Sequence, residues 1–548
     1  MNKAENLAPD GRWPPAQLQS ETHFDGRRML CYHPRPAHLG DLIEVATAQR
    51  AGQLALIDGA LELSWQEVHA WSARLASGLH AQGLRQGDRA VLLMGNHAGF
   101  FIALLALIRL GVVAVPVSTR EAPPGIAYIL EQCQARALIA DLSQSSRLEQ
   151  IPFGVWDGLR VCMDGLAQDL EPTPGWVSGA SLLQHAPWSG MADADEEAPA
   201  VILYTSGTTG RPKGAMLTHL NLVHSVLHYR HALGLTHSDR ALLAVPASHV
   251  TGLVAIVLAM AGVGGCTVML REFKAAACLQ LLEKHRITYS LMVPAMYALC
   301  VREPDLPARD LAAWRLAGFG GAPMPPATIS ALRAQCPAIR LFNAYGATET
   351  TSPTTLTPPD STLVDQVGIP LPCAQVRVVD EDGQDVPTGQ SGEVWIAGPM
   401  VVPGYWNNPE ATAAGFHGGY WKSGDIGTLD ENGYLQVHDR KKDMINRGGY
   451  KVFSVEVENC LMAHPDVQEA ATVGVPCPVL GERTHAFVYA PGQTDPVALQ
   501  ESLSQWCKSH LADYKVPDRW TWLETPLPRN ANGKLIKTAL REQARSGC

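Results

Sequence analysis

Residues 205–214 combine hydroxyl groups, glycines and a lysine in one short run. The run is Thr205-Ser206-Gly207-Thr208-Thr209-Gly210-Arg211-Pro212-Lys213-Gly214, and it follows an apolar stretch, residues 200–204, that predicts a buried strand. Glycines allow backbone N–H groups to approach and face a polyanion, and Lys213 adds a positive charge. The run is not a Walker A loop, because Pro212 and Gly214 flank the lysine and disfavour an immediate helix. It predicts a loop that grips a triphosphate; the alternative is a polar turn between two strands.

A second run, Asn343-Ala344-Tyr345-Gly346-Ala347-Thr348-Glu349-Thr350, also offers groups for a nucleotide. Tyr345 can stack on a base and Thr348 can bond a phosphate. Glu349 supplies the oxygen ligands that Mg²⁺ prefers. The alternative is a strand-to-helix turn in which Thr348 is the N-cap residue.

Three further positions have chemistry that a ligand can use. Asp425 follows Gly424 at a predicted strand, where a carboxylate can accept both ribose hydroxyls, although a simple Gly-Asp turn has the same sequence. His249 follows the predicted strand 241–246, at the end where α/β proteins place ligand groups. Residues 316–323 predict a strand that ends in the small residues Gly320, Gly321, Ala322 and Pro323. Such small residues allow a flat ring to approach the backbone closely.

The charged run 439–451 falls between two compact patterns, where a linker is expected, although most charged runs are solvated surface. Lys534 follows Asn532-Gly533 in a terminal loop, where a lysine is ordinarily exposed and without a role.

Together these runs resemble the motifs of the adenylate-forming superfamily, which includes acyl-CoA synthetases, luciferases and adenylation domains of peptide synthetases. The resemblance covers the chain from about Leu42 onward. It implies that the loop of Thr205 to Lys213 holds ATP phosphates, that residues 320–323 and the run from Asn343 to Thr348 bind the adenine and acyl groups, and that Glu349 holds Mg²⁺.

The same resemblance assigns roles near the carboxyl end. Asp425 and Arg440 would bind ribose, and Lys442 would be the pivot of a small mobile domain. Gly448 and Gly449 would form a turn beside the channel for the pantetheine arm of CoA.

The catalytic assignments also come from the resemblance. His249 stands where acyl-CoA synthetases carry an aromatic or histidine gate near the substrate carboxylate. Lys534 would stabilise negative charge between that carboxylate and the α-phosphate.

The implied reaction is ATP-dependent activation of a carboxylic acid to an acyl-adenylate with release of pyrophosphate, followed by attack of the CoA thiol. The small residues with Val250, Leu253 and Phe319 nearby favour a hydrophobic aliphatic or aryl acid. Three alternatives stay open: a ligase that loads a carrier-protein thiol, a luciferase-like oxidoreductase, and an inactive nucleotide- or acyl-binding protein.

Composition restricts the class of protein. A net charge of −10 argues against a general nucleic-acid binder. The twelve cysteines form no CxxC pairs and indicate buried thiols in a reducing compartment. No run is long and apolar enough for a transmembrane helix and no signal peptide is visible, so we expect a cytoplasmic protein, either monomer or homodimer.

The predicted elements supply the frame for these residues. Strands at 90–94, 111–117, 241–246 and 289–294 alternate with helices, and this order favours parallel sheets. One helix starts with a capping box at Ser64, and another helix starts at Asn96. Residues beyond 367 favour an antiparallel β subdomain, and the last hundred favour a small α+β domain. We therefore expect an α/β fold with an irregular arm (1–40), a large domain of two mainly parallel αβ subdomains and a β subdomain (41–438), a hinge (439–443) and a small mobile lid domain (444–548).

Overall fold

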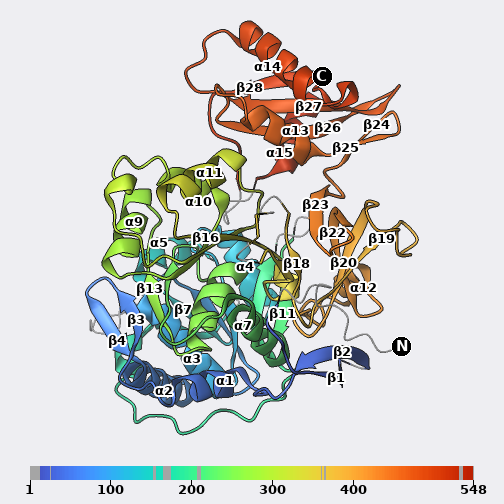
Figure 1. Ribbon diagram of the computed structural model, residues 1–548. Helices are drawn as coiled ribbons and strands as arrows, with labels where there is room; N and C mark the ends of the chain where they lie inside the picture. Colours follow the sequence, from blue (N-terminus) through green and yellow to red (C-terminus); the bar gives the residue numbers. More distant parts are fainter. Residues whose placement is uncertain are drawn as a thin grey trace. The chain divides into compact units, whose positions relative to one another are not determined.

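The computed structural model describes residues 13–24, 26–151, 156–163, 174–205, 211–358, 361–362, 366–529 and 535–546. These fall into two compact units (Figure 1). The first unit comprises Met1–Val376, Trp395–Lys422 and Asn432–Leu435, and the second comprises Arg377–Val394, Ser423–Glu431 and Gln436–Cys548.

A nine-stranded sheet in the first unit has the order β18-β17-β16-β15-β14-β12-β13-β3-β4. The strands from β16 to β3 in this order are all parallel to their neighbours, whereas β4, β17 and β18 pair antiparallel at the edges. Parallel strands of this kind are buried on both faces, as their apolar sequences require. The strands are β3 (Leu54–Asp58), β4 (Leu61–Ser64), β12 (Arg240–Leu243), β13 (Cys266–Met269), β14 (Tyr289–Met292), β15 (Leu316–Gly320), β16 (Arg340–Tyr345), β17 (Thr355–Leu356) and β18 (Ile369–Pro370).

A seven-stranded sheet in the same unit has the order β11-β10-β6-β5-β7-β8-β9. All neighbours are parallel except β10 and β11, which form an antiparallel pair at one edge. The strands are β5 (Arg89–Leu93), β6 (Val113–Pro116), β7 (Ala137–Ala140), β8 (Leu159–Cys162), β9 (Val177–Ser178), β10 (Pro199–Thr205) and β11 (Lys213–Thr218). The predicted α/β class with mainly parallel sheets is confirmed.

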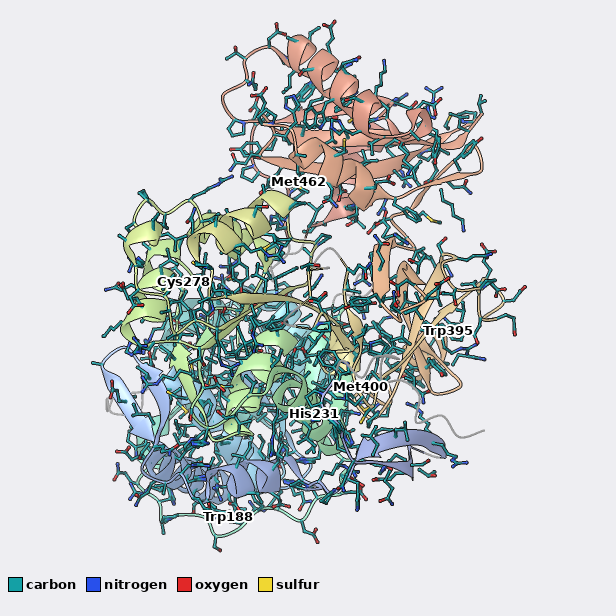
Figure 2. All side chains as sticks on the ribbon, in the orientation of Figure 1. Trp188, His231, Cys278, Trp395, Met400 and Met462 are labelled. Carbon is teal, nitrogen blue, oxygen red and sulfur yellow. The ribbon has the colours of Figure 1, made fainter. Side chains whose placement is uncertain are left out.

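Helices connect these strands and bury one apolar face against them. Cys278 on α9 belongs to a core cluster that includes residues of β14, β15 and α11 (Figure 2). The longer helices of this unit are α1 (Leu39–Thr47), α2 (Trp65–Ala81), α3 (Ala98–Leu110), α4 (Pro123–Gln132), α7 (His219–Leu233), α9 (Ala275–Lys284), α10 (Pro294–Cys300) and α11 (Pro326–Gln335).

The start of α2 is as the sequence predicts, and the start of α3 is not. Ser64 and Glu67 form both hydrogen bonds of a capping box. The next helix begins at Ala98, two residues after the predicted start at Asn96, because His97 is the N-cap residue and its side chain accepts from the Gly99 N–H. The Asn96 amide instead bonds the carbonyl of Val245 and the N–H of Ala247, so it ties the start of α3 to the end of β12.

Part of the amino-terminal arm, which we predicted to be irregular, is a β-hairpin. Strands β1 (Leu18–His23) and β2 (Arg27–Tyr32) pair antiparallel in register from Leu18↔Tyr32 to His23↔Arg27. The polar sequence of β1 gives little local strand signal. The hairpin is fixed by burial of Met29 and Cys31 against Leu220, a contact with a distant helix that local sequence does not reveal.

The predicted antiparallel β subdomain corresponds to a five-stranded sheet of order β19-β20-β22-β21, with β23 also pairing with β22. Helix α12 (Pro409–Gly415) leads into β21. The strands are β19 (Gln375–Val379), β20 (Gly392–Ala397), β21 (Phe416–His417), β22 (Tyr420–Leu429) and β23 (Leu435–Arg440).

The last hundred residues form a sheet of order β25-β24-β27-β26, with β28 on β27, and three helices. The longest of these helices is α14, which begins at Pro496 and ends at His510. A small α+β arrangement is therefore present in the second unit. Its elements are β24 (Ile445–Arg447), β25 (Tyr450–Val452), α13 (Ser454–Met462), β26 (Glu469–Cys477), β27 (Gly481–Tyr489), α14 (Pro496–His510), β28 (Arg519–Leu523) and α15 (Lys537–Ser546). Within the described ranges, every helix is too short or too polar to cross a bilayer.

Candidate active site

The antiparallel pair of β10 and β11 brings the two ends of the predicted phosphate loop together. Thr205 at the end of β10 lies opposite Lys213 at the start of β11. The residues between, Ser206, Gly207, Thr208, Thr209 and Gly210, lie outside the described residues. The loop therefore starts and ends at one edge of the seven-stranded sheet, with Lys213 at its base.

Glu349 lies beside this base. Its Oε1 accepts a hydrogen bond from the Tyr405 hydroxyl at 2.9 Å, and the Thr205 hydroxyl lies 3.4 Å away. The Lys213 ammonium lies 5.4 Å from the centre of the Tyr405 ring. Thr205 and Tyr405 thus face the same carboxylate, that of Glu349, and Lys213 lies nearby. Glu349 is only 8% exposed.

Tyr405 is a hydrogen-bond donor to this carboxylate. Burial first, and then the charge of Glu349, raise the pKa of the Tyr405 phenol far above its usual value, so the phenol keeps its proton. Its place is fixed by the main chain, since Ala215 and Tyr405 form a β-bridge and the Trp406 N–H donates to the Gly214 carbonyl at 2.7 Å. The ring therefore lies where β11 begins.

The donor set around Glu349 suits Mg²⁺. The cation prefers carboxylate oxygens and the oxygens of a bound phosphate, and it keeps several waters. Both protein hydroxyls face Oε1, and none of the described residues hydrogen-bonds Oε2. A carboxylate held by one oxygen can offer the other to a hard cation.

The turn that carries Glu349 is backbone-strained on its carboxyl side. Thr348–Thr350 form one 3₁₀ turn, with Ala347 rather than Thr348 in the N-cap position. Thr351 and Ser352 then adopt φ angles of 51° and 67°, a left-handed conformation that is uncommon for residues other than glycine. Buried hydrogen bonds, including that between the Tyr229 and Ser352 hydroxyls, hold the turn.

The glycines of β15 serve two purposes. A Cβ at Gly318 would lie 2.4 Å from the Phe342 ring, and one at Gly320 would lie 2.4 Å from the carbonyl oxygen of Ala344. These two glycines are required for packing against β16, which sequence reasoning did not recognise. Gly321 has a φ of 78° and no atom within 4 Å of its Cβ position, and Ala322 and Pro323 are exposed, so a ring can approach here.

The residues of β16 and its exit differ in exposure. Asn343 is buried, and its amide nitrogen donates to the Gln366 carbonyl at 3.1 Å. Tyr345 and Thr348 are half-buried and Gly346 is exposed. Tyr345 and Thr348 thus remain in reach of a ligand, whereas the Asn343 amide nitrogen is engaged within the protein.

His249 precedes a segment of π-helix, Thr251–Leu258. The Thr251 N–H donates to Nδ1 of His249 at 3.3 Å, so in the neutral imidazole the proton is on Nε2. A Cβ at Gly252 would lie 2.2 Å from the Pro246 carbonyl oxygen, so only glycine permits this close turn after β12. The Tyr289 hydroxyl donates to the Ala255 carbonyl within the π-helix, a helix form that is frequent at functional sites.

In the second unit, Asp425 and Arg440 form an ion pair. Nε of Arg440 lies 2.8 Å from Oδ1 of Asp425, which is buried, whereas the Arg440 side chain is 39% exposed. The Ser423 hydroxyl accepts from the Asp425 N–H and donates to the Val394 carbonyl. The two predicted ribose ligands are therefore adjacent and held by β22 and β20.

Gly448 and Gly449 connect β24 and β25 with φ angles of 62° and 89°. Two positive φ angles in a two-residue hairpin turn are favoured by glycine. The Gly448 N–H donates to the Leu480 carbonyl at 2.7 Å. Lys442, the predicted pivot, is exposed, and Lys534 lies outside the described residues.

Comparison with known proteins places this arrangement in a family. The family model of the AMP-binding enzyme matches residues 43–406, and that of the AMP-binding enzyme C-terminal domain matches residues 456–534. The chain belongs to the AMP-binding enzyme family. The predicted adenylate-forming superfamily is thereby confirmed.

Individual members of the family are similar over most of their length. A feruloyl-CoA synthase of Amycolatopsis sp is 34% identical over 500 residues, which cover 89% of this chain and 95% of that protein. A fatty acid–[acyl-carrier-protein] ligase, ScoC, of Streptomyces coeruleorubidus is 31% identical over 501 residues, covering 88% and 91%. The crystal structure of the anthranilate CoA ligase AuaEII with anthranoyl-AMP has a TM-score of 0.87 and 27% identity, covering 94% and 98%.

As an AMP-binding enzyme of the acyl-CoA synthetase type, the protein is an acid–thiol ligase that uses ATP, Mg²⁺ and CoA. Tyr405 is the residue of this AMP-binding enzyme that sequence reasoning missed as a site residue. No local sequence pattern marks it, since Tyr405 lies between β20 and α12 and its contact with Glu349 joins residues 56 positions apart.

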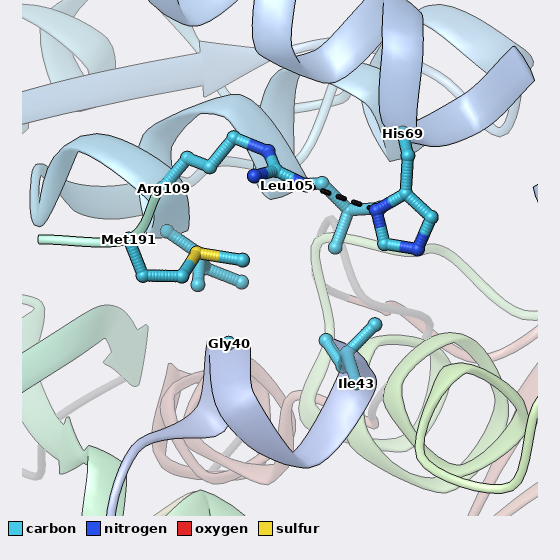
Figure 3. Close-up of a pocket in the computed structure, with 7 residues that line it drawn as sticks. Gly40, Ile43, His69, Leu105, Arg109 and Met191 are labelled. Carbon is cyan, nitrogen blue, oxygen red and sulfur yellow. Dashed lines mark hydrogen bonds between the residues drawn. The ribbon is translucent and has the colours of Figure 1, made fainter. Parts of the chain in front are cut away.

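A small pocket of about 10 Å³ in the first unit lies among other residues (Figure 3). Nη2 of Arg109 donates to Nδ1 of His69 at 2.9 Å along its wall. The pocket has room for about one water and includes none of the predicted site residues, so we assign it no catalytic role. It is lined by Gly40, Ile43, His69, Leu105, Ile108, Arg109 and Met191.

Proposed function

We propose that this enzyme converts a hydrophobic aliphatic or aryl carboxylic acid to its CoA thioester through an acyl-adenylate. The observation that carries the proposal is the convergence of Glu349, Tyr405, Thr205 and Lys213 at the base of the predicted phosphate loop. A carboxylate for Mg²⁺ beside a loop for phosphates is the arrangement that an ATP-dependent adenylation needs.

The phosphate side of the reaction falls to the first unit. In the proposal, Lys213 and the loop from Thr205 to Gly210 bind the β- and γ-phosphates while the acid's carboxylate attacks the α-phosphorus. Bound Mg²⁺ would neutralise phosphate charge, and Glu349, oriented by Tyr405, would hold it. Gly321, Ala322, Pro323 and Tyr345 would border the adenine.

The hydrophobic acid is supported by the residues that follow β12. Val250 and Leu253 are buried apolar side chains after β12, and the segment Thr251–Leu258 is apolar throughout its buried length. Phe319, also buried and apolar, lies on β15. The relatives named for ferulate and fatty acids act on acids of this kind. His249, with its proton on Nε2, would donate to an oxygen of the substrate carboxylate.

In the proposal, residues of the second unit bind the ribose and switch the enzyme from adenylation to thioester formation. Asp425 would accept the ribose hydroxyls, with Arg440 holding its carboxylate. Lys534 would stabilise the charge that accumulates at the α-phosphate. Rotation at Lys442 would then remove Lys534 and bring the Gly448–Gly449 turn to the pantetheine arm, since the lysine and the thiol need the same space.

The test is a product assay. The purified protein is incubated with ATP, Mg²⁺, CoA and a panel of aliphatic and aryl acids, while AMP, pyrophosphate and acyl-CoA are followed together. We expect acid-dependent AMP and thioester in equal amounts, and loss of adenylation in Lys534→Ala. Absence of acid-dependent pyrophosphate across the panel would contradict the proposal.

A carrier-protein thiol is the second candidate acceptor, favoured by the similarity to the carrier-protein ligase ScoC. Acid-dependent pyrophosphate without thioester when CoA is the only thiol would support this reading over CoA.

A cytoplasmic location is part of the proposal. The eleven cysteines in the described ranges form no disulfide, and all but Cys460 are buried, which suits a reducing compartment.

A further inference from the structure

The chain around the predicted pivot is tied to the β subdomain on its amino-terminal side. The Lys441 N–H donates to the Gly424 carbonyl at 2.8 Å, and its ammonium lies 3.0 Å from the Glu393 carboxylate. Arg440, at the end of β23, pairs with Asp425 of β22, the strand that also carries Gly424. These bonds fix the peptide plane between Arg440 and Lys441 to β22 and β20.

The carboxyl side of the pivot is tied to helix α15 by Arg541. Nη2 of Arg541 donates to the Lys442 carbonyl at 3.0 Å and pairs with Oδ1 of Asp443 at 2.6 Å. The two charged side chains are only 20% and 11% exposed, so the pair is poorly screened by water. The peptide plane between Lys442 and Asp443 is therefore held in the frame of α15.

Between these two fixed peptide planes lie only the φ and ψ angles of Lys441 and Lys442. The Lys442 carbonyl belongs to the peptide of Asp443, so a turn about these angles carries it along with α15 and leaves the Arg541 bonds intact. The bonds from the N–H groups of Asp443 and Met444 to the Arg440 carbonyl cross the same point, so they would change.

Helix α15 is close in sequence to Lys534, the proposed catalytic lysine. It begins at Lys537, three residues after Lys534 in the sequence. The Lys537 ammonium bonds Glu458 and Ser454 of α13, both at 2.6 Å, and Leu540 is buried. Because of these bonds, α15 stays in the frame of α13 when the chain turns at the pivot.

We propose that Arg541 is a positioning residue that couples α15 to the pivot, so that domain rotation is confined to Lys441 and Lys442. This inference rests on the proposed rotation of the small domain. Without the guanidinium, the peptide of Asp443 gains freedom, the hinge lengthens beyond two residues, and Lys534 is placed less accurately for adenylation.

The test compares Arg541→Ala with Arg545→Ala, which removes an exposed arginine from the same helix. Lys441 and Lys442 are exposed trypsin sites, and cleavage there reports local opening of the hinge. Mass spectrometry identifies the fragments that begin at Lys442 and Asp443. We expect cleavage roughly tenfold faster in Arg541→Ala, the effect of losing one charge-assisted hydrogen bond, and unchanged cleavage in Arg545→Ala.

Activity supplies the second readout. In Arg541→Ala we expect a lower kcat for acid-dependent ATP–pyrophosphate exchange with KM for ATP within about twofold, and partial recovery in Arg541→Lys. Equal hinge cleavage in Arg541→Ala and Arg545→Ala would overturn the inference, as would acceleration of every tryptic cut alike, which indicates global destabilisation. Because proteolysis needs no substrate, this result is independent of whether the proposed ligase activity is found.

Discussion

Replacement of Tyr405 by phenylalanine removes one hydroxyl and keeps the ring. The hydroxyl donates to Oε1 of Glu349 at 2.9 Å, whereas the Thr205 hydroxyl is 3.4 Å away, beyond the usual range for a hydrogen bond between two oxygens. Tyr405 is therefore the main donor that orients this buried carboxylate. Among the described residues, Tyr405→Phe leaves Oε1 with only the longer contact.

The size of the effect follows from the type of bond. A hydrogen bond to a charged acceptor contributes about 1.5–3 kcal/mol net. About 1.4 kcal/mol corresponds to a factor of ten, so if the whole contribution acts on the transition state, kcat/KM for ATP falls by about 10- to 150-fold. The apparent Mg²⁺ requirement should rise with it, because Glu349 is the proposed ligand.

The assay is acid-dependent ATP–pyrophosphate exchange, measured over a range of free Mg²⁺ concentrations. Tyr420→Phe is the matched control, since its hydroxyl donates to the neutral Gln375 amide oxygen at 3.1 Å in the same unit. We expect the control to stay within about twofold of the unmodified enzyme, as a bond to a neutral acceptor away from the proposed metal does not affect adenylation.

Equal exchange rates and equal Mg²⁺ dependence for Tyr405→Phe and Tyr420→Phe would refute this reasoning. They would mean that Glu349 is oriented without Tyr405, or that it does not hold the metal. A loss of folding in Tyr405→Phe, seen as a much lower unfolding temperature, is checked alongside so that it is not counted as a catalytic effect.

Three further predictions concern stability and nucleotide binding. Burial lowers the pKa of His228 to about 3. Between pH 6.5 and 3 the unfolded chain therefore binds a proton at this histidine that the folded chain does not. The free energy of unfolding then decreases by about 1.4 kcal/mol for each unit by which the pH is lowered. On acidification from pH 6.5 to 4.5, the unfolding temperature of His228→Leu should therefore decrease less than that of the unmodified protein. An equal decrease in both proteins would contradict this. Gly320→Ala places a Cβ 2.4 Å from a main-chain oxygen of β16 and should cost about 1–3 kcal/mol, seen as a lower unfolding temperature, whereas Gly52→Ala meets no atom within 4 Å and should cost little. Asp425→Asn should raise KM for ATP roughly tenfold and reduce the preference for ATP over 2′-deoxy-ATP in the exchange assay. An unchanged preference would show that Asp425 does not bind the ribose.

Local chemistry in the sequence determined many elements and motifs. The capping box at Ser64 fixes the start of α2, and Asp495 with Pro496 marks the start of α14, because caps act on the next few residues only. The apolar runs predicted strands of the parallel sheets, because a strand that is buried on both faces is apolar along its length whichever strand it pairs with. The hydroxyl- and glycine-rich run between Thr205 and Lys213 predicted a phosphate loop from its own composition.

Only the tertiary structure decided which distant residues meet. The bond of Tyr405 to Glu349, the need for glycine at position 320 and the bonds of Arg541 to the pivot each join segments far apart in the sequence. Such contacts depend on strand register and on how helices pack, and neither is encoded within a short window of residues. The sequence therefore determined the kinds of groups available for adenylation, whereas the packing of the chain decided which of them orient one another.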